Sequence, residues 1–234
     1  MMTDMGSTAP RGTILIFTRT LGFRHASIPA GIEAVRDLGT ANGLAVEATE
    51  DATAFTPENL ARYRAVVWLS TSGDVLDAGQ RSAFEAYVRA GGGYAGVHGA
   101  ADTGYAWPWY GRLVGAWFEQ HPPVQTATIR VEDRDHPSTR HLDRTWSRTD
   151  EWYDFRTNPR PRVRVLASVE ESTYRGGGMG ADHPIAWCHD HAGARSWYTG
   201  LGHTEASFAE PAMRAHLLGG IQYAAATEPG PTAR

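Results

Sequence analysis

The clearest candidate for chemistry is His98, which ends an apolar stretch that begins at Gly91 and is followed by Gly99. A short strand that runs into a tight glycine turn is how many α/β enzymes lift a nucleophile above the carboxyl edge of a sheet. Here that position holds neither serine nor cysteine. Imidazole is a poor substitute as an acyl-transfer nucleophile, but it moves protons and binds metals. The pattern therefore predicts acid–base or metal chemistry in place of acyl transfer.

Polar groups follow three other predicted strands in the same way. Residues 22–25 come after the first strand, residues 70–74 after the third, and residues 200–205 after a strand near the end of the chain. Because open α/β sheets bind ligands at the carboxyl ends of their strands, we expect these groups and His98 to share one cleft. Any one of them, taken alone, would be an ordinary turn. The candidate catalytic residues are His98, His25, His203 and Glu205, and the candidate substrate-binding residues at these strand ends are Thr71, Gly73, Asp74 and Asp102.

The pair His203 and Glu205 has a spacing that is typical of triad amidotransferases, where a late His-x-Glu orients the base for the cysteine of the turn. With His98 in place of that cysteine, the chain could form a His/His/Glu cluster. The alternative is that Glu205 only opens the next helix, where a carboxylate is favourable.

Two further segments combine aromatic and polar side chains. His121 stands in a loop beside aromatic residues, and an acidic pair meets two aromatics at residues 149–153. Such a mixture suits the hydroxyls and the apolar face of a sugar, although loop histidines and acidic residues are commonly just solvated. The candidate substrate-binding residues here are His121, Glu151, Trp152 and Tyr153. The sequence contains no zinc motif of the HExxH or CxxC type and no Walker A motif, and we expect no nucleotide cofactor.

The elements that must position these residues alternate between strand and helix in the first half of the chain. Apolar runs predict strands at residues 13–18, 44–49, 65–69 and the run that ends at His98. Helices are predicted at 27–42 with Ser27 as N-cap, at 56–60, and at 78–90 with Asp77 as cap. This order is typical of a parallel, doubly wound sheet flanked by helices.

The second half is less regular. Strands are predicted at 124–132, 163–169, 185–189 and 196–199, and the Arg- and Pro-rich residues 133–161 read as a long loop. The last helix is expected to open with a capping box from Ser207 to Glu210, with Met213, Leu217 and Ile221 as its apolar stripe. Without an internal repeat or a linker, residues 12–226 are predicted to form a single domain, with disordered ends at 1–11 and 227–234.

Composition excludes several classes of protein. With 234 residues and 41% hydrophobic residues, the chain has material for one large core, and a net charge of −4 gives no reason to expect nucleic acid or an anionic membrane as partner. No apolar run approaches a signal sequence or a membrane span. The single cysteine, Cys188, lies in an apolar run and agrees with a reducing, cytoplasmic location. Aromatic residues such as Trp107, Trp109 and Trp117 could line a pocket or an interface of a homo-oligomer.

Several motifs in fixed order resemble the ThuA family, named for trehalose utilisation, from residue 13 to about residue 226. These motifs are Gly22-Phe23-Arg24-His25, Thr71-Ser72-Gly73-Asp74, Gly96-Val97-His98, His121-Pro122, Asp150-Glu151-Trp152-Tyr153, Pro184-Ile185-Ala186-Trp187 and Tyr198-Thr199-Gly200-Leu201-Gly202-His203. The resemblance implies an α/β fold that is doubly wound, with a mostly parallel sheet, flavodoxin-like or class I glutamine amidotransferase-like.

The same resemblance implies a carbohydrate partner and action on keto-sugars or glycosides of the 3-keto-disaccharide type. A carbonyl at C3 acidifies the C2–H bond, so a base could generate an enediolate that leads to isomerisation or to β-elimination. A divalent metal, Zn or Mn, held by His25, His98, Glu151 and His203 would stabilise that charge. The alternative is a sugar-binding or regulatory module on an amidotransferase-like scaffold without its cysteine. Glutamine hydrolysis is disfavoured, because Cys188 belongs to a different strand.

Overall fold

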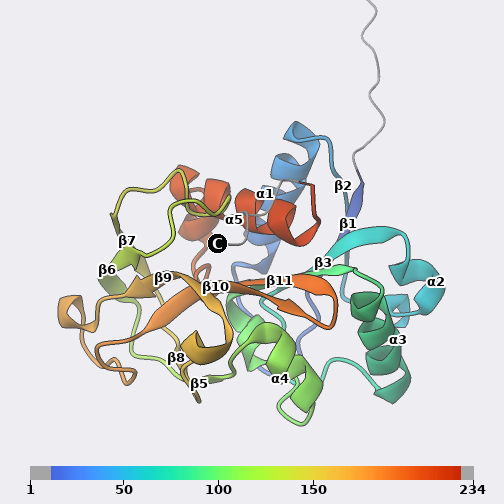
Figure 1. Cartoon of the computed structure of the whole chain (residues 1–234), viewed down its shortest axis with the longest axis horizontal. Helices are drawn as coiled ribbons and strands as arrows, with labels where there is room; N and C mark the ends of the chain where they lie inside the picture. The colour runs from blue at the N-terminus through green and yellow to red at the C-terminus, as the bar shows by residue number, and fades with distance from the viewer. Residues whose placement is uncertain (1–11, 228–234) are drawn as a thin grey trace, which may run out of the picture.

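Short apolar runs of the sequence form the centre of a nine-stranded mixed sheet in the computed structural model, which describes residues 12–227. The strand order is β2-β1-β3-β4-β11-β10-β9-β6-β7 (Figure 1). The strands of this sheet are β1 Thr13–Phe17, β2 Ala45–Thr49, β3 Tyr63–Leu69, β4 Gly93–Val97, β6 Gln125–Val131, β7 Thr145–Asp150, β9 Arg164–Val169, β10 Pro184–His191 and β11 Ala194–Thr199. A second, two-stranded sheet pairs β5 Phe118–Gln120 with β8 Asp154–Phe155.

Helices cover both faces of the main sheet, as its apolar strands require. The helices are α1 Ile28–Ala41, α2 Pro57–Leu60, α3 Ala78–Arg89, α4 Pro108–Val114 and α5 Pro211–Ala224. Helices α1 and α5 lie together on one face, and α3 and α4 lie on the other (Figure 1). The predicted doubly wound α/β fold is therefore confirmed.

The sheet is mostly parallel in the direction of its strands. Strands β2, β1, β3, β4 and β11 are parallel neighbours, whereas each pair from β11 to β10, β9, β6 and β7 is antiparallel. Two successive reversals restore the direction, so only β10 and β6 run against the other strands. The carboxyl end of β7 therefore points to the same edge of the sheet as the ends of β4 and β11.

The predicted long loop at residues 133–161 is wrong, because this segment contains β7, β8 and a 3-10 helix at Arg160–Arg162. The reason lies in the buried face of β7. That face consists of Trp146, Arg148 and Asp150, while the residues between them are exposed. Two of the three buried side chains are ionic, so the alternation that defines the strand is not an alternation of apolar residues.

Two predicted helix starts differ in their capping, although Ser27 stands at the N-cap position of α1 as predicted. The hydroxyl of Ser27 does not cap α1 and instead donates to the carbonyl of Gly202 at 3.2 Å. The capping box from Ser207 to Glu210 is absent, because residues 205–208 form a separate 3-10 helix capped by Thr204, and α5 begins at Pro211. Proline is favoured in the first turn of a helix, where its missing N–H costs nothing. The predicted stripe of α5 is buried as expected, at Met213, Leu217 and Ile221.

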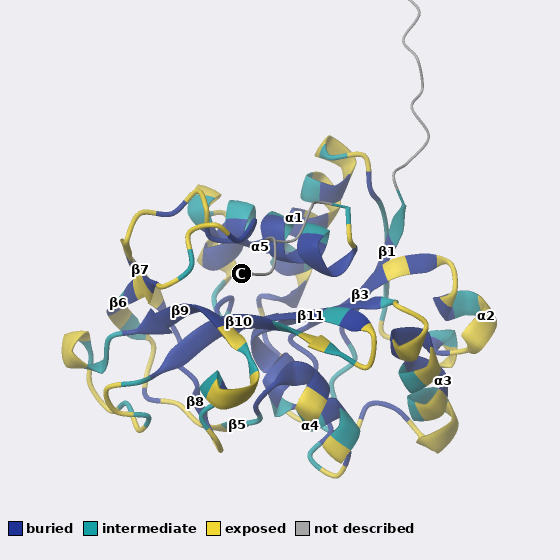
Figure 2. Cartoon of the chain, viewed as in Figure 1, coloured by how far each residue is buried: buried dark blue, intermediate teal, exposed yellow. Residues whose placement is uncertain are grey.

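Most of the aromatic residues are core. The indoles of Trp68, Trp152, Trp187 and Trp197 are fully buried, and the central strands are buried along their length (Figure 2). Cys188 is also buried, as predicted, and burial raises the pKa of its thiol to about 12. The abundance of tryptophan is therefore explained mainly by packing, and exposed large apolar side chains are few among the described residues: Leu21, Phe23 and Val124.

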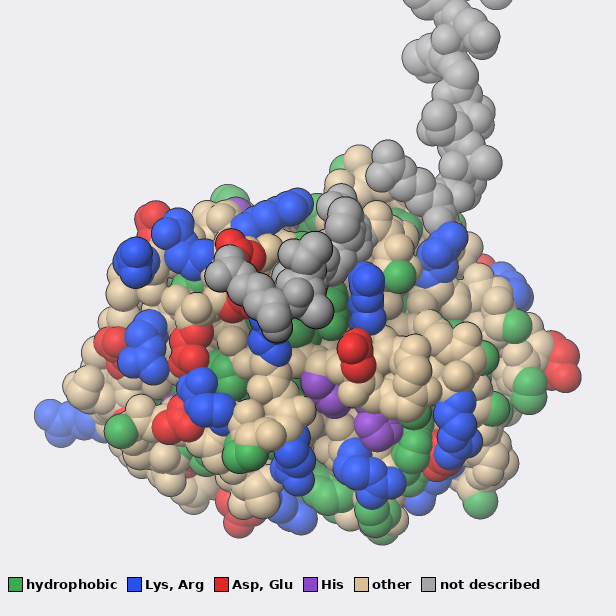
Figure 3. Space-filling model, viewed as in Figure 1, with side chains coloured by type: hydrophobic (Ala, Val, Ile, Leu, Met, Phe, Trp, Pro, Cys, Tyr) green, Lys and Arg blue, Asp and Glu red, His purple; other side chains and the backbone are tan. Residues whose placement is uncertain are grey.

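Acidic and basic side chains are interspersed on the face drawn in Figure 3, without a broad region of one sign. No helix within residues 12–227 is long and apolar enough to cross a bilayer. The predicted disordered ends, 1–11 and 227–234, lie outside the described residues except for Thr227, whose N–H donates to the carbonyl of Gln222 at 3.1 Å.

Candidate active site

Three histidines and one glutamate from four distant segments meet at the carboxyl edge of the sheet. His25 follows β1, His98 follows β4, His203 follows β11, and Glu151 follows β7. Each offers one ligand-type atom, and these four atoms all lie within 4.8 Å of one another. The structure therefore brings together the three imidazoles that the strand ends predict. We call these four residues the histidine–glutamate cluster.

His98 occupies a strained turn, as the glycine-flanked strand predicts. Its φ of 47° lies in the left-handed region, which residues other than glycine rarely adopt. A side chain on the following residue, Gly99, would collide with the backbone of Ser70 and Thr71. The turn places the fully buried imidazole with Nδ1 2.7 Å from the carbonyl of Gly200. A carbonyl only accepts, so Nδ1 donates to it, and the ring is oriented with Nε2 toward the cluster.

Glu151 contacts two histidines of the cluster through one carboxylate oxygen and His121, outside the cluster, through the other. Its Oε2 lies 3.3 Å from Nε2 of His98 and 3.1 Å from Nδ1 of His203, and its Oε1 lies 3.0 Å from Nδ1 of His121. Burial by itself raises the pKa of Glu151, but hydrogen bonds from His203 and His98 outweigh burial and hold that pKa well below its usual range. Glu151 is therefore an anion at neutral pH.

The other two histidines differ in protonation. Burial, with the neighbouring His98 and His203, lowers the pKa of His25 to about 3, so its ring is neutral at neutral pH. Its Nδ1 is buried without a hydrogen-bond partner. The hydrogen bond with Glu151 raises the pKa of His203, against a smaller effect of burial. The cluster thus contains a neutral imidazole, a carboxylate and an imidazole that readily takes a proton.

The cluster fits a divalent cation. Imidazole nitrogens and one carboxylate oxygen are the ligands that Zn²⁺ prefers, and Mn²⁺ accepts the same set. The unpartnered Nδ1 of His25, whose ring is neutral at neutral pH, agrees with this, since a ligating imidazole must be neutral. The contact between Nδ1 of His98 and the carbonyl of Gly200 is the kind that orients a histidine ligand.

A pocket of about 180 Å³ opens onto the cluster. Aromatic rings form part of its wall, because Tyr153 lies 4.2 Å from the ring of His98 and Phe118 lies 4.2 Å from Tyr153, measured between centroids. Its lining residues are Phe23, His25, Asp102, Phe118, His121, Glu151, Tyr153 and His203. The pocket thus combines apolar walls with a polar floor. Trp107, Trp109 and Trp117 are not among the lining residues.

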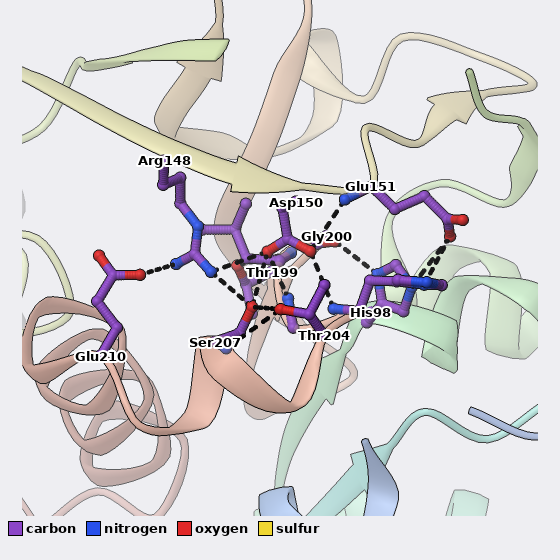
Figure 4. Close-up of polar contacts among 12 residues, drawn as sticks. His98, Arg148, Asp150, Glu151, Thr199, Gly200, Thr204, Ser207 and Glu210 are labelled. Atoms are coloured by element: carbon purple, nitrogen blue, oxygen red, sulfur yellow. Dashed lines mark hydrogen bonds and ion pairs between the residues drawn. The ribbon is translucent and has the colours of Figure 1, made fainter. Parts of the chain in front are cut away.

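A buried ion pair between Arg148 and Asp150 holds the loop that carries His203 (Figure 4). Asp150, which is fully buried, accepts the N–H of Gly202 at 2.9 Å and the N–H of His203 at 3.0 Å. The guanidinium of Arg148 lies 3.0 Å from the same carboxylate and 3.3 Å from Glu210. Strands β10, β9 and β6 separate β7 from β11 in the sheet, so this half of the sheet must curl for Asp150 to reach the loop of His203.

The structure does not place Glu205 in the cluster. Its side chain is exposed in the first turn of the 3-10 helix at Glu205–Phe208, as the alternative interpretation has it. The carboxylate that joins His98 and His203 is Glu151 instead. Sequence spacing suggested Glu205, which is two positions from His203 along the chain. Glu151 is nearer to His203 in the fold, but it is separated from His203 by 52 positions along the chain.

Four predicted substrate-binding residues lie away from the pocket. The hydroxyl of Thr71 is buried 2.9 Å from that of Thr103, and Gly73 bridges to Thr103 through its backbone. Asp74 is exposed and pairs with Arg81 at 3.2 Å. Trp152 points into the core and donates its indole N–H to the carbonyl of Gln125. By contrast, the pocket is lined by the predicted residues Asp102, His121, Glu151 and Tyr153.

Sequence reasoning missed three residues of the site: Phe23, Phe118 and Asp150. Phe23 and Asp150 belong to motifs in which only neighbouring residues were predicted to be functional. Phe118 lies three positions before His121. The sequence could have indicated Phe23, because a large aromatic side chain close to a candidate histidine can form part of the wall of a binding pocket. Nothing in the local sequence indicates that Asp150 is buried.

Comparison with known proteins agrees with the family resemblance of the sequence motifs. The ThuA family model, described as trehalose utilisation, matches residues 13–224. A ThuA-like protein from Bacteroides uniformis is similar at 26% identity and a TM-score of 0.79, with 93% of each chain covered. One from Parabacteroides merdae has 20% identity and a TM-score of 0.78, over 96% of this chain and 92% of the other.

More distant structures share the fold alone. A β-galactosidase from Bacillus circulans has a TM-score of 0.56 at 14% identity, over 92% of this chain but 31% of the enzyme. No curated protein matches the sequence.

Proposed function

The chain belongs to the ThuA family of trehalose utilisation, and on this premise we propose that it is an enzyme of keto-sugar metabolism. The proposed substrates are keto-sugars or glycosides of the 3-keto-disaccharide type. The proposed reaction removes the proton from the carbon next to the carbonyl. The resulting enediolate is reprotonated, which is isomerisation, or expels the glycosidic oxygen, which is β-elimination. The single observation that supports this chemistry is the histidine–glutamate cluster at the floor of the pocket.

The residues present suit the charge that develops in this reaction. Protonated His203 is a donor for the oxyanion, because its hydrogen bond with Glu151 raises its pKa. A divalent cation bound by His25, His98, Glu151 and His203 would replace this donor, because a ligating His203 must be neutral, and it would supply Lewis-acid stabilisation of the same oxyanion. The rings of Phe118 and Tyr153 restrict water beside the cluster, which strengthens electrostatic interactions there.

A sugar-binding or regulatory module is the second candidate. It is favoured by the turn after β4, where His98 stands in place of a thiol and the only cysteine is buried in β10. Pure recognition of sugar hydroxyls does not require three imidazoles around one carboxylate, and this argument favours the enzyme. The lack of a thiol at the turn also argues against glutamine hydrolysis, since no acyl intermediate could form there.

The test is incubation with 3-keto-trehalose in D₂O, with and without Mn²⁺ or Zn²⁺, followed by NMR. An enzyme of the proposed kind should introduce solvent deuterium at C2 and then yield an isomer or cleavage products. Sugar binding without exchange and without product would reject the enzyme and favour the binding module. The variant His98→Gln should lose the exchange, and its melting temperature would show whether it still folds.

A further inference from the structure

Asp102 is a second carboxylate in the same pocket, outside the histidine–glutamate cluster. It is the last residue of the 3-10 helix His98–Asp102, so the turn that presents His98 also fixes the backbone of Asp102. Its side chain is half-buried and lines the pocket together with His25, Glu151 and His203. A carboxylate in a pocket with candidate reaction machinery is placed to contact a bound substrate.

The hydrogen bonding of Asp102 leaves one oxygen free to react. The hydroxyl of Tyr105 donates to Oδ1 at 2.7 Å, and no protein group within residues 12–227 donates to Oδ2. The nearest guanidinium, that of Arg156, stacks on the ring of Tyr105 at 4.0 Å and pairs with Glu119 at 3.2 Å. Asp102 therefore has a positioned oxygen and, among the described residues, no direct ion pair, and burial raises its pKa more than the charge of Arg156 lowers it.

Its surroundings support this basicity. Burial raises the pKa of Asp102, and the hydrogen bond from Tyr105 opposes the increase. A carboxylate with a raised pKa is a stronger base than a solvated one. The titratable and charged groups that face it are Tyr105, Arg156 and His98, and the pocket adds His25, His121, Glu151 and His203.

The imidazoles are less suited to act as the base. His98 has Nδ1 on the carbonyl of Gly200 and Nε2 beside Glu151. Nδ1 of His203 and Nδ1 of His121 both lie against Glu151 as well. The contact with Glu151 favours the protonated form of His203, which can donate a proton but cannot accept one, so proton removal is left to Asp102 or to His121.

We propose that Asp102 is the general base of the reaction proposed above, taking the proton from the carbon next to the carbonyl through Oδ2 while Tyr105 holds Oδ1. This assignment rests on the proposed function. The electron pair of the C–H bond forms the carbon–carbon double bond of the enediolate, and the carbonyl oxygen takes the negative charge. In isomerisation, the protonated Asp102 returns the proton to carbon. In β-elimination, the glycosidic oxygen leaves with the electron pair of its bond to carbon and receives that proton.

The test compares Asp102→Asn with the wild-type chain in the deuterium exchange of 3-keto-trehalose. Asparagine has the same shape and still accepts from Tyr105, so the fold should be kept. We expect exchange at C2 to fall by about 10²-fold or more, while binding of trehalose, which has no carbonyl, changes less than about threefold. Asp143→Asn, in the exposed loop before β7, is the matched control and should exchange like the wild type.

The outcomes separate the two proposals. If the wild-type chain shows no deuterium exchange, both the proposed function and the assignment of Asp102 as the base are rejected. Exchange in both the wild type and Asp102→Asn rejects the base alone, and loss of exchange in His121→Gln but not in Asp102→Asn would move the role to His121.

If Asp102→Asn does not fold, the variant Tyr105→Phe provides a second test of the proposed base. Removing the hydrogen bond to Oδ1 in Tyr105→Phe should raise the pKa of Asp102, because that bond favours the charged form. In a plot of exchange rate against pH, the fall in rate on the acidic side should therefore occur at a higher pH than in the wild type. A fall at the same pH as in the wild type would overturn the assignment.

Discussion

The carboxylate of Asp150 holds the backbone of His203, accepting its N–H at 3.0 Å. Asp150 ends β7 and His203 follows β11, so this hydrogen bond ties the antiparallel half of the sheet to the loop that carries a site histidine. Arg148 neutralises the carboxylate from the same buried face of β7. The position of His203 thus depends on an ion pair that does not line the pocket.

Asp150→Asn should destabilise the fold. The change leaves the buried guanidinium of Arg148 with only the partly exposed Glu210 as a carboxylate partner, and breaking a buried pair costs up to about 3–5 kcal/mol. Urea unfolding would measure the loss. Asp37→Asn removes an exposed pair with Arg214 and should cost about 0–1 kcal/mol. Equal losses in the two variants would contradict the role of the buried pair.

Glu151→Gln should remove most of the affinity for a divalent metal. We expect untagged wild-type protein, purified without added metal, to carry about one equivalent of a divalent ion, because the four ligand atoms converge. Elemental analysis would show this, with Glu205→Gln as the matched carboxylate outside the cluster. Less than about a tenth of an equivalent in the wild type would reject the metal site.

Stability in acid should depend on Glu132. The hydrogen bond from Arg160 is the main cause that lowers its pKa to about 2, against the opposing effect of burial. Because the pKa is lower in the folded state, the contribution to stability is complete above the unfolded value of 4.5 and is lost as the pH falls toward about 2. Glu132→Gln should therefore be less stable than the wild type at pH 6, with a difference that shrinks toward pH 2.

The partner of this pair provides the check. Arg160→Gln should show a pH dependence of the same sign and at least the same size, since Arg160 meets Glu132 at 2.8 Å and also lowers the pKa of Asp182. Urea unfolding across this pH range gives the difference for each variant. A difference between the wild type and Glu132→Gln that stays constant with pH would show that the ion pair does not carry this part of the stability.

Phe23→Ala should weaken sugar binding without affecting the fold. Phe23 lines the pocket and is 64% exposed, so its removal leaves no cavity in the core. Loss of a ring that packs on a sugar face should reduce affinity about 2- to 10-fold. Calorimetry with trehalose would detect this change. Leu21→Ala removes a side chain of similar exposure outside the pocket lining, and an equal loss there would refute a specific role for Phe23.

The parts of the fold and site that could be predicted from sequence are those built from parallel apolar strands. Such strands leave polar residues at their carboxyl ends, which is why His25, His98 and His203 could be assigned to one cleft. Asp77 could be assigned as a cap because its capping box lies within four consecutive residues.

The position of the Glu151 carboxylate in the site could not be predicted from the pattern of apolar strands. Glu151 reaches the cluster because β7 returns to the same edge after four reversals of direction from β11, and the buried ionic residues of β7 hide it from an apolar pattern. Glu205 was the natural choice along the chain, since only the curvature of the sheet shows that another carboxylate lies nearer. Long-range pairing, not local propensity, decided which acid joined the histidines.

The histidine–glutamate cluster takes its members from positions 25 to 203 of a chain of 234 residues. During synthesis, the amino-terminal strands leave the ribosome with two of the three histidines, but the nascent polypeptide lacks the last of them until β11 has emerged. A truncated translation product that ends before this strand would carry most of the hydrophobic core and none of the assembled chemistry.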